Sequence, residues 1–171
     1  MTFRLATRPA AQALRVPKTP LVRTVTSLSK VAYTAKAESS GAGRNGDVKL
    51  REGGPLKFQL TLPKSLGGSG EGHNPEQFFA LGYSACFLSA VNAVARAQKV
   101  NLPKDIEVHA DVSIGTPEGR QGFGLAVELL VKASYEAAQR EELEGVIKAA
   151  HEMCPYSNAV RNNIPVKVSL A

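Results

Sequence analysis

The sequence predicts an α+β fold in which largely antiparallel sheets surround one long buried helix. Short segments of alternating apolar and polar residues, typical of strands, lie before and after a central apolar segment. The turns between successive strand segments are short, which favours antiparallel pairing. An amphipathic helix and a last strand complete the chain. At 171 residues the chain has room for one domain of ordinary size.

Three short strands in meander order are predicted before the central segment. The first covers residues 31–37, and the last covers residues 58–62. Asn45-Gly46 is a strong hairpin-turn signal, so the return strand is expected at residues 48–50. The glycine-rich loop at residues 65–72 lacks the lysine of a phosphate-binding loop and is expected to connect this sheet to the central helix.

The central helix has a clear start signal. Asn74 can cap free backbone N–H groups, Pro75 suits the first helical position, and Glu76 favours the positive end of the helix dipole. No charged residue follows until Arg96, so the helix is apolar on nearly all sides and is expected to be buried. Its apolar stretch is at the short end for a membrane span and begins with a cap typical of soluble proteins, so no span is predicted.

The rest of the chain predicts a second hairpin, a helix and a strand. Residues 106–114 and 122–133 form the hairpin, and residues 136–153 form an amphipathic helix that Pro155 ends. Residues 164–170 form the last strand. The three histidines are spread along the chain and show no metal-ligand spacing with the cysteines, so no metal site is predicted.

The formal net charge of +6 is concentrated at the N-terminus. The first 30 residues hold six basic residues and no acidic one, whereas residues 31–171 are formally neutral. A nucleic-acid-binding face is therefore not expected. The segment is rich in Arg, Ser, Thr and Ala, which predicts a mitochondrial transit peptide at residues 1–30, disordered or cleaved, ahead of a domain at residues 31–171. The matching location is the mitochondrial matrix; the alternative is a basic tail on a cytoplasmic protein.

Cys86 lies within the central helix, and Cys154 lies at the end of the amphipathic helix. In a secreted protein the pair would suggest a structural bridge, whereas in a reducing compartment a catalytic, redox or metal role is favoured. A buried thiol needs a nearby cation or hydrogen-bond donor to become reactive, and an inert core cysteine needs neither. A second thiol can protect a sulfenic acid by condensing with it to a disulfide. Cys154 is at a helix end, where the local backbone movement needed by such a thiol costs little.

Several motifs resemble the organic hydroperoxide resistance family, within the wider osmotically inducible protein C (OsmC) superfamily. Residues 72–77 and 82–87, GHNPEQ and GYSACF, resemble the active-site helix of that family. The second cysteine motif is matched by residues 154–159, CPYSNA, and the family's arginine by Gly43-Arg44. The resemblance covers residues 31–171, and the two cysteine motifs together are specific.

The resemblance implies a thiol-dependent peroxidase, an organic hydroperoxide reductase that acts on substrates including fatty-acid hydroperoxides. By this likeness Cys86 is the peroxidatic thiolate, oxidised to a sulfenic acid, and Cys154 is the resolving thiol that forms a disulfide with it. Arg44 would favour the thiolate and polarise the peroxide, and Glu76 would orient Arg44. No cofactor is bound; dihydrolipoamide or lipoylated dehydrogenase complexes would recycle the disulfide. The alternative is a lipid-binding or redox-sensing module of the same fold without peroxidase turnover.

Helix geometry adds a prediction about assembly. Glu76 and Cys86 are ten residues apart on one expected helix, which separates them by about 15 Å along its axis. We therefore predict an intertwined homodimer in which Arg44 and Glu76 act on Cys86 of the partner subunit across a two-fold interface. Four aromatic residues on the helix are candidates for the acyl-chain pocket, with ordinary core packing as the alternative: Phe78, Phe79, Tyr83 and Phe87.

Overall fold

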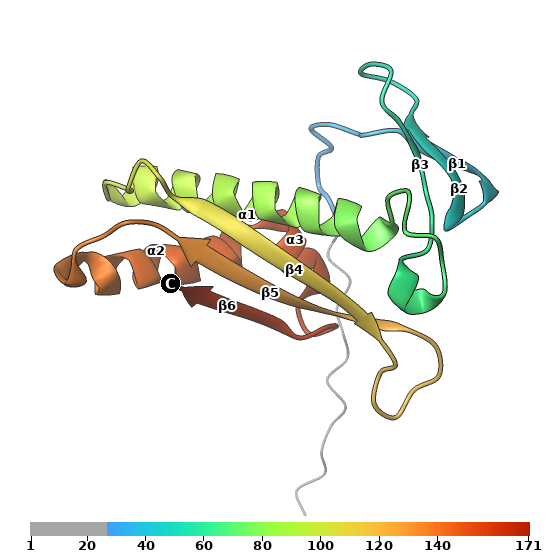
Figure 1. Ribbon diagram of the computed structural model, residues 1–171. Helices are drawn as coiled ribbons and strands as arrows, with labels where there is room; N and C mark the ends of the chain where they lie inside the picture. Colours follow the sequence, from blue (N-terminus) through green and yellow to red (C-terminus); the bar gives the residue numbers. More distant parts are fainter. Residues whose placement is uncertain (1–26) are drawn as a thin grey trace, which may run out of the picture. The chain divides into compact units, whose positions relative to one another are not determined.

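The computed structural model describes residues 27–171, and its compact unit is Ala32–Ala171 (Figure 1). Most of the predicted transit peptide, residues 1–26, lies outside the described residues. The α+β prediction is confirmed. The elements are β1 (Ala37–Ala42), β2 (Asn45–Leu50), β3 (Lys57–Gln59), α1 (Pro75–Gln98), β4 (Glu107–Gly115), β5 (Gly124–Lys132), α2 (Arg140–Met153), α3 (Pro155–Val160) and β6 (Val166–Leu170).

The smaller sheet is the predicted antiparallel meander β1-β2-β3, with a shifted turn. Its first turn is Gly43-Arg44, and Asn45-Gly46 lies inside β2. Gly43 supplies the left-handed conformation of the turn, with φ of 61°. Gly46 instead allows the backbones of β1 and β2 to approach each other closely, because a Cβ atom there would lie 2.0 Å from the Ser40 carbonyl oxygen. The first strand begins at Ala37 rather than at residue 31, because this turn pairs Ala37 with the last residue of β2.

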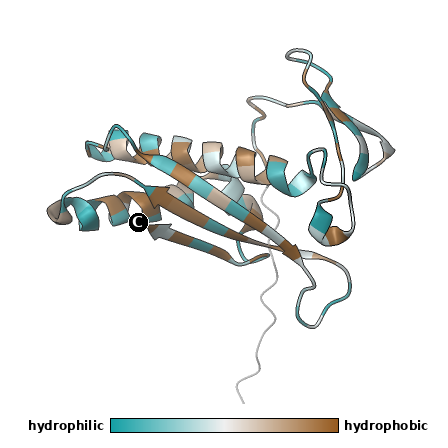
Figure 2. Ribbon diagram, in the orientation of Figure 1, coloured by the Kyte–Doolittle hydropathy of each residue, from teal (hydrophilic) through white to brown (hydrophobic). Residues whose placement is uncertain are grey.

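The larger sheet has the order β4-β5-β6. β4 and β5 form the predicted antiparallel hairpin, whereas β6 pairs parallel to β5 after a crossover through α2 and α3. Alternate residues of β5, Val127, Leu129 and Val131, are buried in the core. Hydrophobic residues run along much of β5 in Figure 2. The alternation shows that one face of the sheet covers the core, against the helices.

The central helix α1 begins as the sequence predicts. The Asn74 side chain accepts a hydrogen bond from the Gln77 N–H at 3.0 Å, and the Gln77 side chain accepts one from the Asn74 N–H at 3.0 Å. One side of the helix packs against β4, α2 and α3. Tyr83, Phe87 and Val91 on this side are fully buried, which confirms the core-helix prediction for this side.

The opposite side of α1 is uncovered within one chain. Gln77, Leu81, Ala85, Ser89 and Asn92 are exposed at helical spacing and carry no charge, and Leu81 is 67% exposed. Among the described residues, α1 is also the one helix long and apolar enough to cross a membrane by length and composition. Because its other side belongs to the core, this composition alone is weak support for a span.

Helix α2 is the predicted amphipathic helix, although a 3-10 turn at Ala137–Gln139 delays its start to Arg140. Pro155 ends α2 as predicted and also occupies the first position of the short helix α3. Cys154 is therefore the junction between two helices. The apolar stripe of α2 is buried as predicted, through Leu143, Val146, Ile147 and Ala150.

Helix α3 packs closely on α1 through one glycine. The Tyr156 ring lies over Gly82, where an added Cβ would come within 2.9 Å of the Tyr156 hydroxyl oxygen. The same ring stacks on Phe79, with ring centroids 5.8 Å apart, and contacts Tyr83 at 5.7 Å. The absence of a side chain at Gly82 therefore allows this aromatic cluster to form.

We expect Gly82→Ala to give none of the stabilisation that alanine usually brings to a helix. Alanine gains about 0.5–1 kcal/mol over glycine in a helix interior, but crowding of Tyr156 costs about 1–3 kcal/mol. Gly145→Ala on α2 is the matched control, because its Cβ would meet no atom within 4 Å. Urea unfolding should show Gly145→Ala more stable than the wild type by about 0.5–1 kcal/mol. Equal stabilisation by both substitutions would contradict the proposed crowding.

Candidate active site

The structure brings the two cysteines together. The Cys154 thiol donates a hydrogen bond to the Cys86 sulfur, with 3.4 Å between the sulfur atoms, and both cysteines are reduced. Cys86 is partly exposed, whereas Cys154 is 0% exposed. A disulfide needs a sulfur–sulfur distance of about 2.05 Å. The two sulfur atoms thus lie about 1.4 Å beyond bonding distance.

The backbone of Cys154 is held on both sides. Its N–H donates to the Ala150 carbonyl at 2.8 Å, and its carbonyl accepts from the Asn158 N–H at 3.0 Å. The sequence had suggested that easy backbone movement at a helix end would bring this thiol to its target. The structure instead places the thiol beside Cys86 in advance, so the bond can form without opening α2 or α3.

Within one chain, the environment of Cys86 favours the neutral thiol. Burial raises the pKa of Cys86, and the neighbouring Cys154 thiol raises this pKa further. The opposing influence is a hydrogen bond from the Tyr156 backbone N–H, which lowers the pKa of Cys86 but leaves it above its ordinary value. Arg44 is not among the groups that shift the Cys86 pKa. Among residues 27–171, no cation lowers the pKa of Cys86.

Arg44 and Glu76 form a bidentate ion pair at the N-terminal end of α1. Arg44 Nη1 donates to Glu76 Oε2 at 2.8 Å, and Arg44 Nη2 contacts Glu76 Oε1. The Glu76 side chain is 12% exposed and that of Arg44 is 40% exposed. The hydrogen bond from Arg44 lowers the pKa of Glu76, and the same contact raises the pKa of Arg44. The pair therefore holds a charged guanidinium in a fixed orientation.

Backbone pairing brings these two residues together. Arg44 is in the β1–β2 turn, and Glu76 is in the first turn of α1. His73, just before α1, forms a parallel bridge with Leu60, just after β3. Gly72 makes this approach possible, because a Cβ there would lie 2.7 Å from the Gln59 carbonyl oxygen. The β1–β2 turn is thereby fixed next to the N-terminus of α1.

The four predicted catalytic residues thus form two pairs. Cys86 and Cys154 meet where α1 contacts α3, while Arg44 and Glu76 meet at the start of α1. Cys86 follows Glu76 by ten positions on α1, a spacing of about 15 Å along the axis. The predicted action of Arg44 and Glu76 on Cys86 of the partner subunit therefore stays a prediction.

The four aromatic candidates for an acyl pocket have different surroundings. Tyr83 and Phe87 are fully buried in the core. Phe78 packs against Phe58, with ring centroids 5.0 Å apart. Phe79 alone lines a cavity that also contains the ion pair. Core packing thus accounts for the buried pair, and a substrate contact stays a prediction that the structure favours for Phe79.

The cavity beside Arg44 and Glu76 has a volume of about 340 Å³. The β4–β5 hairpin contributes Ile114, Phe123 and Leu125 to its lining, and Phe123 is 75% exposed. Sequence reasoning did not place these residues at the site. The sequence feature that could have indicated them is Phe123, an aromatic residue near the tip of a predicted hairpin. Such a residue alone does not show which side chains lie beside it.

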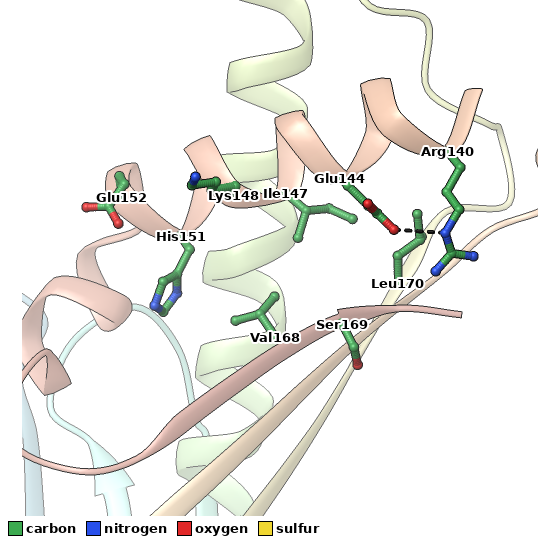
Figure 3. Close-up of a pocket in the computed structure, with 9 residues that line it drawn as sticks. All are labelled: Arg140, Glu144, Ile147, Lys148, His151, Glu152, Val168, Ser169 and Leu170. Atoms are coloured by element: carbon green, nitrogen blue, oxygen red, sulfur yellow. Dashed lines mark hydrogen bonds and ion pairs between the residues drawn. The ribbon is translucent and has the colours of Figure 1, made fainter. Parts of the chain in front are cut away.

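A separate cavity of about 370 Å³ lies between α2 and β6, and none of the four predicted catalytic residues lines it (Figure 3). His151 extends from α2 into this region, near Val168 of β6. The Nδ1 atom of His151 is buried and has no hydrogen-bond partner. Among residues 27–171, no cluster of three His, Cys, Asp or Glu side chains could hold a metal ion.

Comparisons with known proteins agree with this fold. The OsmC-like protein family matches residues 68–169. The organic hydroperoxide resistance protein of Xanthomonas axonopodis pv. citri is 43% identical over 85% of this chain and 99% of its own length. The crystal structure of such a protein from Legionella pneumophila has a TM-score of 0.74 at 45% identity, over 83% of this chain and 99% of that one. The crystal structure of OhrB of Bacillus subtilis has a TM-score of 0.71 at 38% identity, over 82% of this chain and 100% of that one.

The fold and the paired cysteines therefore define an OsmC-like protein. Within that class, the chain belongs to the organic hydroperoxide resistance family. The predicted mitochondrial matrix location is wrong, because these relatives come from bacteria, which have no mitochondria. The cytoplasmic alternative fits them, and the comparisons give no support to a transit peptide.

The partly buried imidazole of His151 predicts a loss of stability in mild acid. Burial, and secondarily Arg161, lowers the pKa of His151 below its ordinary value of 6.5. The unfolded chain then binds more protons than the folded one as the pH falls below about 6.5, so the free energy of unfolding decreases. His151→Gln should lose less stability than the wild type between pH 7 and pH 5.5 in urea titrations. Parallel losses in the two proteins would refute this role.

Proposed function

We propose that the protein is a thiol peroxidase that reduces organic hydroperoxides, including those of fatty acids. The observation that carries this proposal is the 3.4 Å contact between the reduced Cys86 and Cys154 sulfurs. A lipid-binding module gains nothing from two adjacent thiols, one accessible and one buried. The bidentate Arg44–Glu76 pair adds a fixed cation of the kind that a peroxide reaction requires.

The chemistry follows from the accessibility of the two sulfurs. Cys86 first loses its proton; the thiolate then attacks the hydrogen-bearing oxygen of the peroxide, the O–O bond breaks, and the leaving alkoxide takes up that proton and departs as the alcohol. The resulting Cys86 sulfenic acid is then attacked by Cys154, which forms the disulfide and releases water. The partly exposed Cys86 thus meets the substrate, and the buried Cys154 meets only Cys86.

A second copy of the chain supplies the missing cation in this proposal. Burial keeps Cys86 protonated within one chain, and Arg44 is held by Glu76 at the far end of α1. In a two-fold dimer, Arg44 would act on Cys86 of the partner subunit. The uncovered, uncharged side of α1 supports this arrangement, because its exposed Leu81 and Ala85 offer a helix surface that a second copy can cover.

The lining of the cavity near the cation favours organic rather than inorganic peroxides. Phe79, Phe123 and Leu125 surround the ion pair with apolar surface. A hydrocarbon chain placed there would lose its contact with water while its peroxide group faces the guanidinium. Hydrogen peroxide has no such chain and gains no comparable binding energy.

A dithiol reductant suits the geometry of the disulfide. Because Cys154 is fully buried, an external thiolate can reach only Cys86 and releases Cys154 as the leaving group. The second thiol of the reductant then attacks the mixed disulfide, which returns Cys86 and completes the two-electron reduction. Dihydrolipoamide, free or carried by lipoylated dehydrogenase complexes, has two thiols so placed, and we propose it as the recycling partner.

Consumption of cumene hydroperoxide with dihydrolipoamide as reductant tests the proposal. Cys86→Ser should reduce turnover to the uncatalysed rate. Cys154→Ser should consume one equivalent of peroxide and then lose the disulfide route of recycling. Arg44→Ala should lower turnover by roughly 100-fold, the cost of removing one donor from a charged transition state.

Arg140→Ala is the matched control for loss of a guanidinium, because Arg140 lies on the surface of α2 in a salt bridge with Glu144. Its turnover should stay within about twofold of the wild type. Equal turnover by the wild type and Cys86→Ser would exclude the peroxidase. A wild-type protein that takes up one equivalent of peroxide without further turnover would instead be a redox sensor.

Subunit mixing tests whether the site is shared. Two inactive variants, Cys86→Ser and Arg44→Ala, can be co-expressed with different affinity tags and the mixed dimer purified. If Arg44 acts across the interface, one of the two sites in that dimer has both residues intact, so it should show about half of wild-type turnover. Each parent homodimer should stay inactive. A mixed dimer as inactive as its parents would place both residues in the same chain.

A further inference from the structure

A second contact joins α1 and α3 one helical turn from the cysteines. The Tyr83 hydroxyl donates a hydrogen bond to the Ser157 hydroxyl oxygen at 3.0 Å, and both side chains are 0% exposed. Tyr83 precedes Cys86 by three residues on α1, and Ser157 follows Cys154 by three residues. The hydrogen bond and the sulfur pair therefore link the same two segments at matching positions.

This hydrogen bond is costly to break. Among the described residues, Ser157 is the one buried polar side chain. If α3 moved away from α1, the phenol and the hydroxyl would both remain without partners in an apolar core, where each carries a desolvation penalty. Burial also raises the pKa of Tyr83, so the phenol stays neutral and keeps its donor proton throughout the physiological range.

The Tyr83–Ser157 hydrogen bond differs from the sulfur pair in one respect that matters for the proposed catalytic cycle. The contact between Cys86 and Cys154 changes at each turnover, from two thiols to a sulfenic acid and a thiol and then to a disulfide. The hydroxyl pair contains no redox-active atom and can persist through all of these states. Of the other contacts of α3 with α1, the hydrogen bond from the Tyr156 N–H involves the reacting Cys86 sulfur itself, and the Tyr156 ring over Gly82 is apolar and less directional.

We propose that the Tyr83–Ser157 hydrogen bond is a positioning element for the resolving cysteine, which holds Cys154 in line with the Cys86 sulfenic acid. This inference rests on the proposed peroxidase function. In the resolving step a bond forms between the two sulfurs, the sulfur–oxygen bond of the sulfenic acid breaks, and the Cys154 proton leaves with the hydroxyl group as water. The rate of this step depends on how often Cys154 occupies the attacking position.

The first chemical step makes no such demand. Reduction of the peroxide requires Cys86, the peroxide and the cation that activates them; Cys154 forms no bond in this step and enters only through its lesser contribution to the Cys86 pKa. Loss of the hydroxyl pair should therefore slow disulfide formation and leave peroxide reduction unchanged. A general weakening of the fold would not separate the two steps in this way.

Tyr83→Phe is the least disruptive test, because it removes only the hydroxyl group. After one equivalent of cumene hydroperoxide, we expect disulfide formation to be about fivefold slower, which corresponds to one lost hydrogen bond. Dimedone should trap correspondingly more sulfenic acid, and the bimolecular rate of peroxide reduction should stay within about twofold of the wild type. Ser157→Ala should behave alike, and the double variant should be no slower than either single one, because all three lose the same contact.

Tyr135→Phe is the matched control for removal of a phenol hydroxyl. The Tyr135 hydroxyl accepts a hydrogen bond from Arg140 at the surface, 2.9 Å away, and does not contact the cysteine segments. Its rates of peroxide reduction and disulfide formation should equal those of the wild type. An unchanged rate of disulfide formation in Tyr83→Phe, or an equal fall in both steps, would overturn the positioning role.

A glutathione redox titration keeps this test separate from that of the peroxidase. It measures the effective concentration of the two thiols for each other, with no peroxide present. We expect Tyr83→Phe to lower this effective concentration about fivefold relative to the wild type and Tyr135→Phe. If the wild type fails to turn over peroxide but this difference is found, the peroxidase proposal fails and the positioning role stands. If the difference is absent, the positioning role fails whatever the peroxidase activity.

Discussion

The contact between α1 and α3 is the interaction on which the thiol site depends. It requires Gly82, because a larger residue would meet the Tyr156 ring, and it buries the hydrogen bond between Tyr83 and Ser157. The same packing places the Cys154 sulfur 3.4 Å from that of Cys86. A resolving thiol usually has to reach its target by movement, but here the packing of two helices has already brought it there.

The same burial that joins the cysteines also works against their chemistry. An apolar environment raises the pKa of Cys86, and the one cation that the resemblance assigns to it, Arg44, is held by Glu76 about 15 Å away along α1. In the proposed enzyme, one chain would therefore carry two halves of a site at the two ends of one helical segment. A symmetric pair of chains is the simplest arrangement that joins such halves, and it would also cover the exposed stripe containing Leu81.

Local signals in the sequence predicted the helices and strands well. Contacts between elements that are distant in the sequence could not be predicted from it. The start of α1 was predictable because the Asn74 cap depends on residues three positions apart. The first hairpin turn was misplaced because Asn45-Gly46 carries the stronger turn signal, while Gly46 is in fact required by the close approach of Ser40. The role of Ser157 could not be predicted, because a serine in a sequence gives no indication that it is buried opposite a tyrosine 74 residues away.

Pro155 shows how one residue serves both the fold and the site. A continuous helix through Cys154 would bond the Tyr156 N–H to a carbonyl of the preceding turn. Pro155 ends α2 and starts α3, so the Tyr156 N–H falls in the first turn of a new helix, where it has no partner within that helix. That N–H donates to the Cys86 sulfur and lowers its pKa. One neutral donor does not outweigh burial, which is the physical reason why the proposed thiolate would need a cation as well.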